Sequence, residues 1–330
     1  MKRWKSLLGV SLAGVLLLGG CGTKDGKEVN GEAKNKEIKI GVTQIVEHPS
    51  LDAAYKGFKK AISANGLKNV KYDVQLAQGD PNNSQTIAKN LVGDNVDLIF
   101  ANSTPSAQHA LNATKDIPIV FTSVTDPVGA KLVKSFDEPG DNITGTTDTH
   151  PDAIPKTIEF IDKETDAKTV GLIYNKGEQN SVAQVDLVKD AMKKSDLKPV
   201  EVSVSTSADV KQAAESLVGR ADVFYIITDN TVVSALESVI SVAEDKDIPM
   251  FAGELDSVKR GAFAAYGFDY YDIGYEAGEM AAKILKGDKK PSELKVQYPQ
   301  KLKLVINKKA AESMGVKLKP EWKSRAEYTE

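Results

Sequence analysis

The 330-residue sequence is poor in the residues that usually carry metal binding, disulfides and catalysis. It holds one cysteine, and its three histidines, His48, His109 and His150, follow no metal-binding spacing. It has no phosphate-binding glycine loop, no nucleophile elbow and no CxxC pair. The sequence therefore predicts no metal, no cofactor and no enzyme, and a single cysteine excludes an internal disulfide.

The sequence after the amino-terminal segment has no long apolar run, so no membrane-spanning helix is expected in that part of the chain. At the amino terminus, three basic residues precede a run from Leu7 to Leu18, which suits a signal-peptide core. Two glycines then stand directly before Cys21, an arrangement that resembles the bacterial lipobox. We expect residues 1–20 to be removed and a lipid on Cys21 to hold the protein outside the cytoplasm, on the cell membrane. The alternative is a chance thiol behind an ordinary secretion signal.

Residues 21–36 are expected to form a flexible, lipidated leash, because Gly22–Lys36 has almost no apolar residue to bury. Without residues 1–20, the chain keeps 40 basic against 46 acidic residues. This mildly acidic balance argues against a nucleic-acid surface. The remaining body of roughly 295 residues exceeds one ordinary core, so two lobes are expected.

Short β-rich apolar runs alternate with helical spacing from residue 37 onward, which predicts parallel sheets covered by helices on both faces. Thr104-Pro105 and Asp126-Pro127 each join a capping residue to a proline, as at helix starts. This alternation of strands and helices stops and begins again once along the chain, which indicates two α/β lobes. The predicted strands are Ile38–Val42, Val70–Leu76, Val96–Ala101, Ile117–Val124 and Asn142–Thr147, then Val170–Tyr174, Val200–Val204, Val223–Thr228, Ile248–Ala252 and Ala262–Tyr266.

The end of the chain adds a helix over Tyr270–Gly287, with small residues on one stripe for close packing, and a strand over Leu302–Ile306. This order resembles the type I periplasmic-binding-protein fold: two Rossmann-like lobes joined by a hinge that the chain crosses three times. The crossings are expected near Gly145–Asp148, Gly267–Asp269 and Tyr298–Lys301. Lobe 1 would then comprise 37–147 plus 268–299, and lobe 2 would comprise 148–267 plus 300–330.

Polar residues follow most of the predicted strands, where ligands of open parallel sheets bind. Any single one of them is more readily explained as a helix cap than as a ligand-binding group. Their number at one end of both sheets favours a shared ligand site in the cleft. The candidate ligand-binding residues are Pro49, Ser50, Leu51, Ser103, Thr104, Thr125, Asp126, Asp148, Asn180, Ser181, Asp229, Asn230 and Glu254.

The candidate site has no arginine, because arginine stands only at positions 3, 220, 260 and 325. An arginine clamp for an anion is therefore not expected, and hydroxyls at a helix start, as at Ser103-Thr104, would hold a carboxylate instead. Asp126, Asp148 or Asp229 would pair with an ammonium. Together these groups describe an amino acid zwitterion. The scarcity of tryptophan counts against a sugar, which stays an alternative together with a nucleoside.

Several segments resemble the ABC-transporter substrate-binding family that includes tryptophan- and phenylalanine-binding lipoproteins. The resemblance implies an aromatic amino acid as ligand, import through a permease and an ATPase, and binding by hinge closure. A ligand-sensing receptor subunit is the alternative role, and a repressor is excluded because a signal peptide stands where its DNA-binding helices would be. The segments that carry the resemblance are Val46-Glu47-His48-Pro49-Ser50-Leu51-Asp52, Ser103-Thr104-Pro105-Ser106-Ala107-Gln108, Thr125-Asp126-Pro127-Val128-Gly129-Ala130, Gly145-Thr146-Thr147-Asp148, Asn180-Ser181 and Asp229-Asn230-Thr231.

Overall fold

The computed structural model describes residues 37–330, which form one compact unit. The predicted signal peptide, Cys21 and the leash lie outside the described residues. Between residues 37 and 330, no helix combines the length and the apolar character needed to cross a bilayer.

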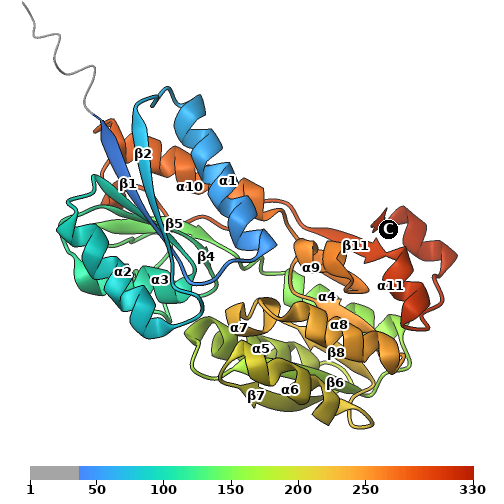
Figure 1. Cartoon of the computed structure of the whole chain (residues 1–330). Helices are drawn as coiled ribbons and strands as arrows, with labels where there is room; N and C mark the ends of the chain where they lie inside the picture. The colour runs from blue at the N-terminus through green and yellow to red at the C-terminus, as the bar shows by residue number, and fades with distance from the viewer. Residues whose placement is uncertain (1–36) are drawn as a thin grey trace, which may run out of the picture. The chain divides into compact units, whose positions relative to one another are not determined.

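Five strands of the described chain form a first sheet in the order β2–β1–β3–β4–β5, with every neighbouring pair parallel. Leu98 and Phe100 of β3 join the core on one face, and Ile99 and Ala101 join the core on the other, as the two-residue period of a strand requires. Helices α1 and α10 cover the first face, and α2 and α3 cover the second (Figure 1). The elements are β1 Ile38–Gln44, α1 Pro49–Ala64, β2 Val70–Leu76, α2 Pro81–Gly93, β3 Leu98–Asn102, α3 Thr104–Ala113, β4 Ile119–Val124, β5 Ile143–Thr147 and α10 Tyr270–Leu285.

A second sheet has seven strands in the order β12–β11–β10–β9–β8–β6–β7. All four residues of its interior strand β8 are buried, which explains their uninterrupted apolar character. The elements of this lobe are α4 Ala153–Glu164, β6 Thr169–Asn175, α5 Gln179–Met192, β7 Lys198–Val204, α6 Val210–Leu217, β8 Val223–Ile226, α7 Asn230–Val233, α8 Leu236–Asp245, β9 Met250–Ala252, α9 Leu255–Arg260, β10 Ala264–Gly267, β11 Lys303–Asn307, α11 Lys308–Ser313 and β12 Ala326–Thr329. Short 3₁₀ turns span Ser207–Asp209, Pro291–Glu293 and Pro320–Ser324.

The second sheet is not wholly parallel as predicted, because β10 and β11 run antiparallel, with Ala264 opposite Ile306. Strand β11 enters this lobe from the last crossing and therefore runs back along β10. The edge strand β12 was not predicted from its four half-exposed residues, but it pairs with β11 in parallel.

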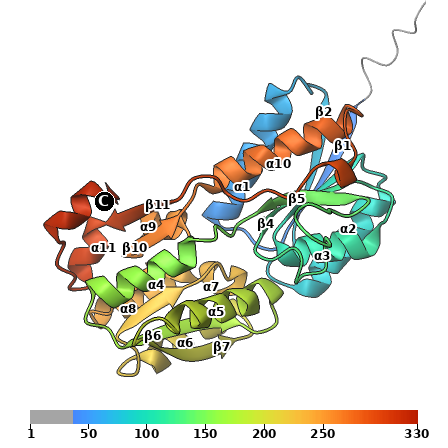
Figure 2. The same ribbon diagram turned by 180° about the vertical axis from the view of Figure 1, so that it is seen from behind.

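The chain passes between the two sheets three times, as predicted: between β5 and α4, between β10 and α10, and between the Pro291–Glu293 turn and β11 (Figures 1 and 2). The first and third crossings lie side by side, because Thr147 donates its backbone N–H to the carbonyl of Gln297 at 2.9 Å. The described residues thus form an α/β fold of two lobes with mainly parallel sheets.

Glycines allow α1 and α10 to pack closely, as the small-residue stripe predicted. A Cβ at Gly274 would lie 1.9 Å from the backbone oxygen of Ala54, and one at Gly57 would lie 2.1 Å from the backbone oxygen of Tyr271. Real Cβ atoms do not approach backbone so closely, so each helix needs glycine where it meets the other.

One predicted helix start is wrong. After Asp126-Pro127 the chain forms a turn, in which the Asp126 carboxylate accepts the backbone N–H of Gly129 at 2.8 Å. The backbone carbonyl of Asp126 also accepts the N–H of Ala130, but no further turn of helix follows. At Thr104-Pro105 a helix, α3, does start, but its cap is Ser103 rather than Thr104, because the Ser103 hydroxyl accepts the backbone N–H of Ser106 at 3.3 Å.

Candidate functional site

A small cavity collects polar side chains from both lobes and from two crossings. Its volume is about 10 Å³, roughly the space for one water molecule. A larger and mainly apolar groove of about 850 Å³ lies elsewhere, over α4 and α5, and takes none of the predicted site residues. The small cavity is lined by His48, Leu51, Ser123, Asp148, Asn180, Thr228, Asn230, Val233, Glu254 and Tyr270.

The structure brings part of the predicted set to this cavity. Leu51, Asp148, Asn180, Asn230 and Glu254 line it directly. Two more contact its lining residues: the Ser50 hydroxyl donates to Glu254, and the Thr125 hydroxyl donates to Asp148. The predicted residues that do not line the cavity are Pro49, Ser103, Thr104, Asp126, Ser181 and Asp229.

Asp148 lies at the first crossing and faces the cavity. Its carboxylate accepts hydrogen bonds from the Thr125 hydroxyl at 3.0 Å and from the Tyr270 hydroxyl at 2.8 Å. Burial raises its pKa, while the bonds from Tyr270, Thr125 and its own backbone oppose that rise. In the described part of the chain, no lysine or arginine lines the cavity. Asp148 therefore offers a desolvated anion that a cationic ligand group would stabilise.

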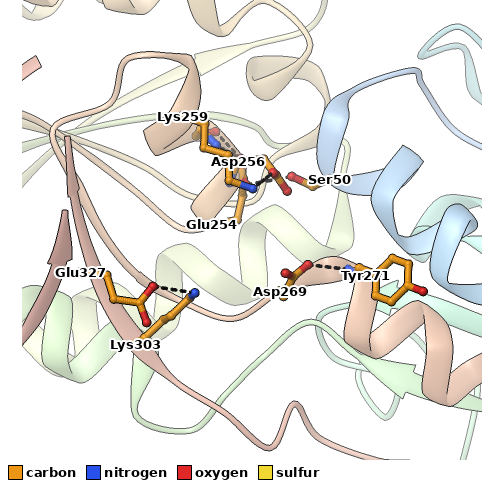
Figure 3. A network of polar contacts seen from close by, with 9 residues as sticks. Ser50, Glu254, Asp256, Lys259, Asp269, Tyr271, Lys303 and Glu327 are labelled. Atoms are coloured by element: carbon orange, nitrogen blue, oxygen red, sulfur yellow. Dashed lines mark hydrogen bonds and ion pairs between the residues drawn. The ribbon is translucent and has the colours of Figure 1, made fainter. Parts of the chain in front are cut away.

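Glu254 links the two lobes. Its carboxylate caps α9 by accepting the backbone N–H groups of Asp256 at 2.6 Å and of Ser257 at 2.9 Å. It also accepts the hydroxyl of Ser50 from α1 at 2.8 Å (Figure 3). Burial raises the pKa of Glu254 despite these hydrogen bonds. A second link joins the amide of Gln184 to the Thr125 hydroxyl at 3.2 Å.

The Asp229 side chain accepts backbone hydrogen bonds and does not line the cavity. Its carboxylate accepts the N–H groups of Asn175 at 2.6 Å and of Val232 at 2.8 Å, and thereby caps α7. Burial, together with the nearby Glu178 carboxylate, raises the pKa of Asp229 to about 7. Asp229 therefore follows the helix-cap interpretation that the sequence left open.

Glu178 orients two amides of the cavity wall. Its carboxylate accepts the side-chain NH₂ of Asn230 at 2.6 Å and that of Asn180 at 3.2 Å. Each amide oxygen is thereby directed away from Glu178. The Oδ1 atom of Asn180 has no hydrogen-bond partner among residues 37–330, so it remains available to a ligand donor.

Two buried serines with unusual backbone angles stand at the ends of neighbouring strands. Ser103, after β3, has φ 127°, and Ser123, within β4, has φ 56°. Such angles cost of the order of 1–3 kcal/mol in a residue with a Cβ, and they cluster at ligand sites. Ser123 lines the cavity, and its hydroxyl donates to the amide oxygen of Asn102 at 2.8 Å.

Sequence reasoning did not include five lining residues: His48, Ser123, Thr228, Val233 and Tyr270. His48 directly precedes the predicted residues Pro49, Ser50 and Leu51, and this proximity is the signal that could have found it. Ser123 and Thr228 fall at strand ends, where a signal was present. Tyr270 reaches the site only because the second crossing returns the chain beside Asp148.

Together, the fold and the polar cavity that both lobes line are those of the class of two-lobe binding proteins. The chain belongs to the ABC transporter substrate-binding protein family, whose model matches residues 39–329. A tyrosine-binding protein of Clostridioides difficile (strain R20291) is 45% identical over 327 residues, which cover 96% of this chain and 94% of that protein. More distant solved structures at 16% identity share the type I periplasmic-binding-protein fold alone.

Two solved relatives represent different ligand states, one bound to an amino acid and one ligand-free and open. A domain from Streptococcus pneumoniae in complex with L-Trp is 33% identical and has a TM-score of 0.84, covering 89% of this chain and 99% of that one. A ligand-free, open substrate-binding protein from Clostridium difficile is 42% identical over the same shares, yet its TM-score is 0.65. The less similar sequence superposes better, so the structure of this chain is nearer to the complex than to the open form, which agrees with the two links between the lobes.

Proposed function

We propose that this protein is an extracytoplasmic lipoprotein that binds an aromatic amino acid between its lobes, without catalysis, and delivers it to an ABC permease and its ATPase. The observation that carries the ligand class is Asp148, a largely buried carboxylate that faces the cavity and has no cationic partner among residues 37–330. The tyrosine-binding relative and the tryptophan complex support the aromatic side chain.

The amino acid backbone would be held at both ends. Its ammonium would bind the Asp148 carboxylate and the free amide oxygen of Asn180. Its carboxylate would bind at the amino terminus of α3, where the hydroxyls of Thr104 and Ser106 are buried without partners among the described residues. Backbone N–H groups at a helix start favour an anion there.

Hinge closure would couple binding to the shape that the permease recognises. We propose lobe boundaries at 37–147 plus 268–299 and at 148–267 plus 300–330. The cavity has room for about one water, so an amino acid requires the lobes to separate before it enters. With the ligand bound, the lobes would close less far than in this structure, and the ligand would favour that state by its differential affinity.

A ligand screen tests the proposed function. In thermal-shift assays followed by calorimetry, tyrosine, tryptophan or phenylalanine is expected to stabilise the full-length protein, by about 2.7 kcal/mol at a ligand concentration of 100 times Kd. Glucose, ribose and uridine serve as comparisons. Stabilisation by a sugar or a nucleoside, with no response to the three amino acids, would establish the alternative ligand class.

The membrane anchor is proposed on Cys21, which lies outside the described residues. Cys21→Ser removes the only thiol that can carry the lipid, and the protein is expected to move almost wholly to the soluble extracytoplasmic fraction, because the acyl chains supply most of the membrane affinity. Fractionation and metabolic labelling with a fatty acid measure this. Unchanged membrane retention of the variant would refute the anchor.

A further inference from the structure

We infer that His48 selects among aromatic amino acids by accepting a hydrogen bond from a polar hydrogen on the ligand's ring. Tyrosine, with its phenol O–H, and tryptophan, with its indole N–H, would then bind more tightly than phenylalanine. The inference rests on the proposed function and adds a specificity-determining residue to it.

His48 lines the cavity, and its side chain does not make the helix-capping hydrogen bond that its position would suggest. It directly precedes α1, yet its side chain does not cap that helix. Only 8% of the residue is exposed, and its Nδ1 atom has no partner among residues 37–330. A buried nitrogen without a partner costs free energy, so a ligand that supplies the missing partner is favoured.

The neighbouring Asn230 determines which proton His48 carries. The Asn230 NH₂ group donates to Glu178, and the hydrogen bond between Asn230 and His48 raises the pKa of His48, as an amide oxygen that accepts a ring N–H does. The ring nitrogen that contacts Asn230 must therefore carry the hydrogen. Because Nδ1 is the unpartnered nitrogen, it holds the lone pair and acts as an acceptor.

The imidazole stays neutral, so this acceptor persists at physiological pH. Burial, and after it the charge of Arg260, lower the pKa of His48 to about 3, although the hydrogen bond with Asn230 acts in the opposite direction. A protonated ring would have no acceptor to offer. The cavity environment thus maintains the form that can receive a hydrogen bond.

The residues next to His48 suit an aromatic ring. Leu51 follows His48 by three residues at the start of α1, and Val233 follows Asn230 by three residues in α7. All four line the cavity, so each lobe contributes one polar and one apolar side chain. The apolar pair would contact the ring faces, while His48 would meet the ring's polar hydrogen.

Calorimetry on the full-length protein tests this with tyrosine, tryptophan and phenylalanine. The wild type is expected to bind tyrosine or tryptophan at least ten-fold more tightly than phenylalanine, because phenylalanine leaves Nδ1 unpaired. His48→Leu should weaken the preferred ligand at least ten-fold and change phenylalanine affinity less than three-fold. His48→Gln, which retains an acceptor, should recover part of the selectivity.

The matched control is His109→Leu, since His109 lies outside the cavity and bonds the hydroxyl of Ser84 at 2.9 Å. It should leave all three affinities unchanged. Equal affinity of the wild type for all three amino acids overturns the inference, even if His48→Leu does not fold. Equal weakening of all three by either folded His48 variant also overturns it. If the wild type binds none of them, the proposed function itself fails, which is a distinct result.

Discussion

Asp148→Asn is expected to weaken binding of the amino acid at least 30-fold. Removing one partner of a largely buried charge pair costs about 2–5 kcal/mol, and each 1.4 kcal/mol is about ten-fold in Kd. Asparagine has nearly the same shape: its oxygen accepts from one of the hydroxyls of Thr125 and Tyr270, and its NH₂ group can donate to the oxygen of the other. Isothermal titration calorimetry with the preferred aromatic amino acid measures the change.

The control for this experiment is Asp126→Asn. The Asp126 carboxylate accepts the N–H of Gly129 in a turn and does not line the cavity, so its loss should leave Kd within about two-fold of the wild type. Melting temperatures of both variants show whether the fold is kept. A folded Asp148→Asn protein that binds with wild-type affinity would place the ammonium elsewhere, with Glu254 as the remaining carboxylate of the cavity wall.

Gly274→Ala is expected to destabilise the protein by about 3 kcal/mol or more. The added methyl group would lie 1.9 Å from the backbone oxygen of Ala54 and 2.5 Å from its carbonyl carbon. Backbone cannot turn aside as a side chain can, so α1 and α10 would have to separate, at a cost near the upper end for overpacking. Chemical denaturation measures the free energy of unfolding, and a fall in Tm of about 6 °C or more should accompany it.

Gly93→Ala is the matched control, because it makes the same chemical change at the end of α2. A Cβ at Gly93 meets nothing within 4 Å, so stability should stay the same or rise by up to about 1 kcal/mol. Equal stability of the two variants would mean that α1 and α10 tolerate a wider spacing than their contacts indicate.

Local pattern was sufficient for much of the architecture. The β-rich runs and the helical spacing predicted most strands, since burial on both faces of a sheet leaves a continuous apolar run, as in β8. The small-residue stripe predicted the close contact of α10 with its neighbour. The direction of β11 could not be predicted in this way, because an apolar run has the same composition in either orientation.

Local sequence pattern could not predict which aspartate of the candidate site faces the cavity. Asp126, Asp148 and Asp229 all follow predicted strands, and nothing in the sequence distinguishes them. The structure assigns Asp126 and Asp229 to backbone N–H groups and leaves Asp148 facing the cavity. The difference depends on the path of the backbone after each strand, which determines whether an N–H group or the cleft faces the carboxylate.

By itself, the sequence determined the alternation of strands and helices, the two-lobe class and the polar character of the strand ends, because each depends on residues close together in the chain. Tertiary structure alone decided which polar groups share one cavity. His48, Asp148 and Tyr270 are far apart in sequence, and they meet because the chain crosses between the lobes. The identity of their neighbours, and hence their burial and protonation, follows from those crossings.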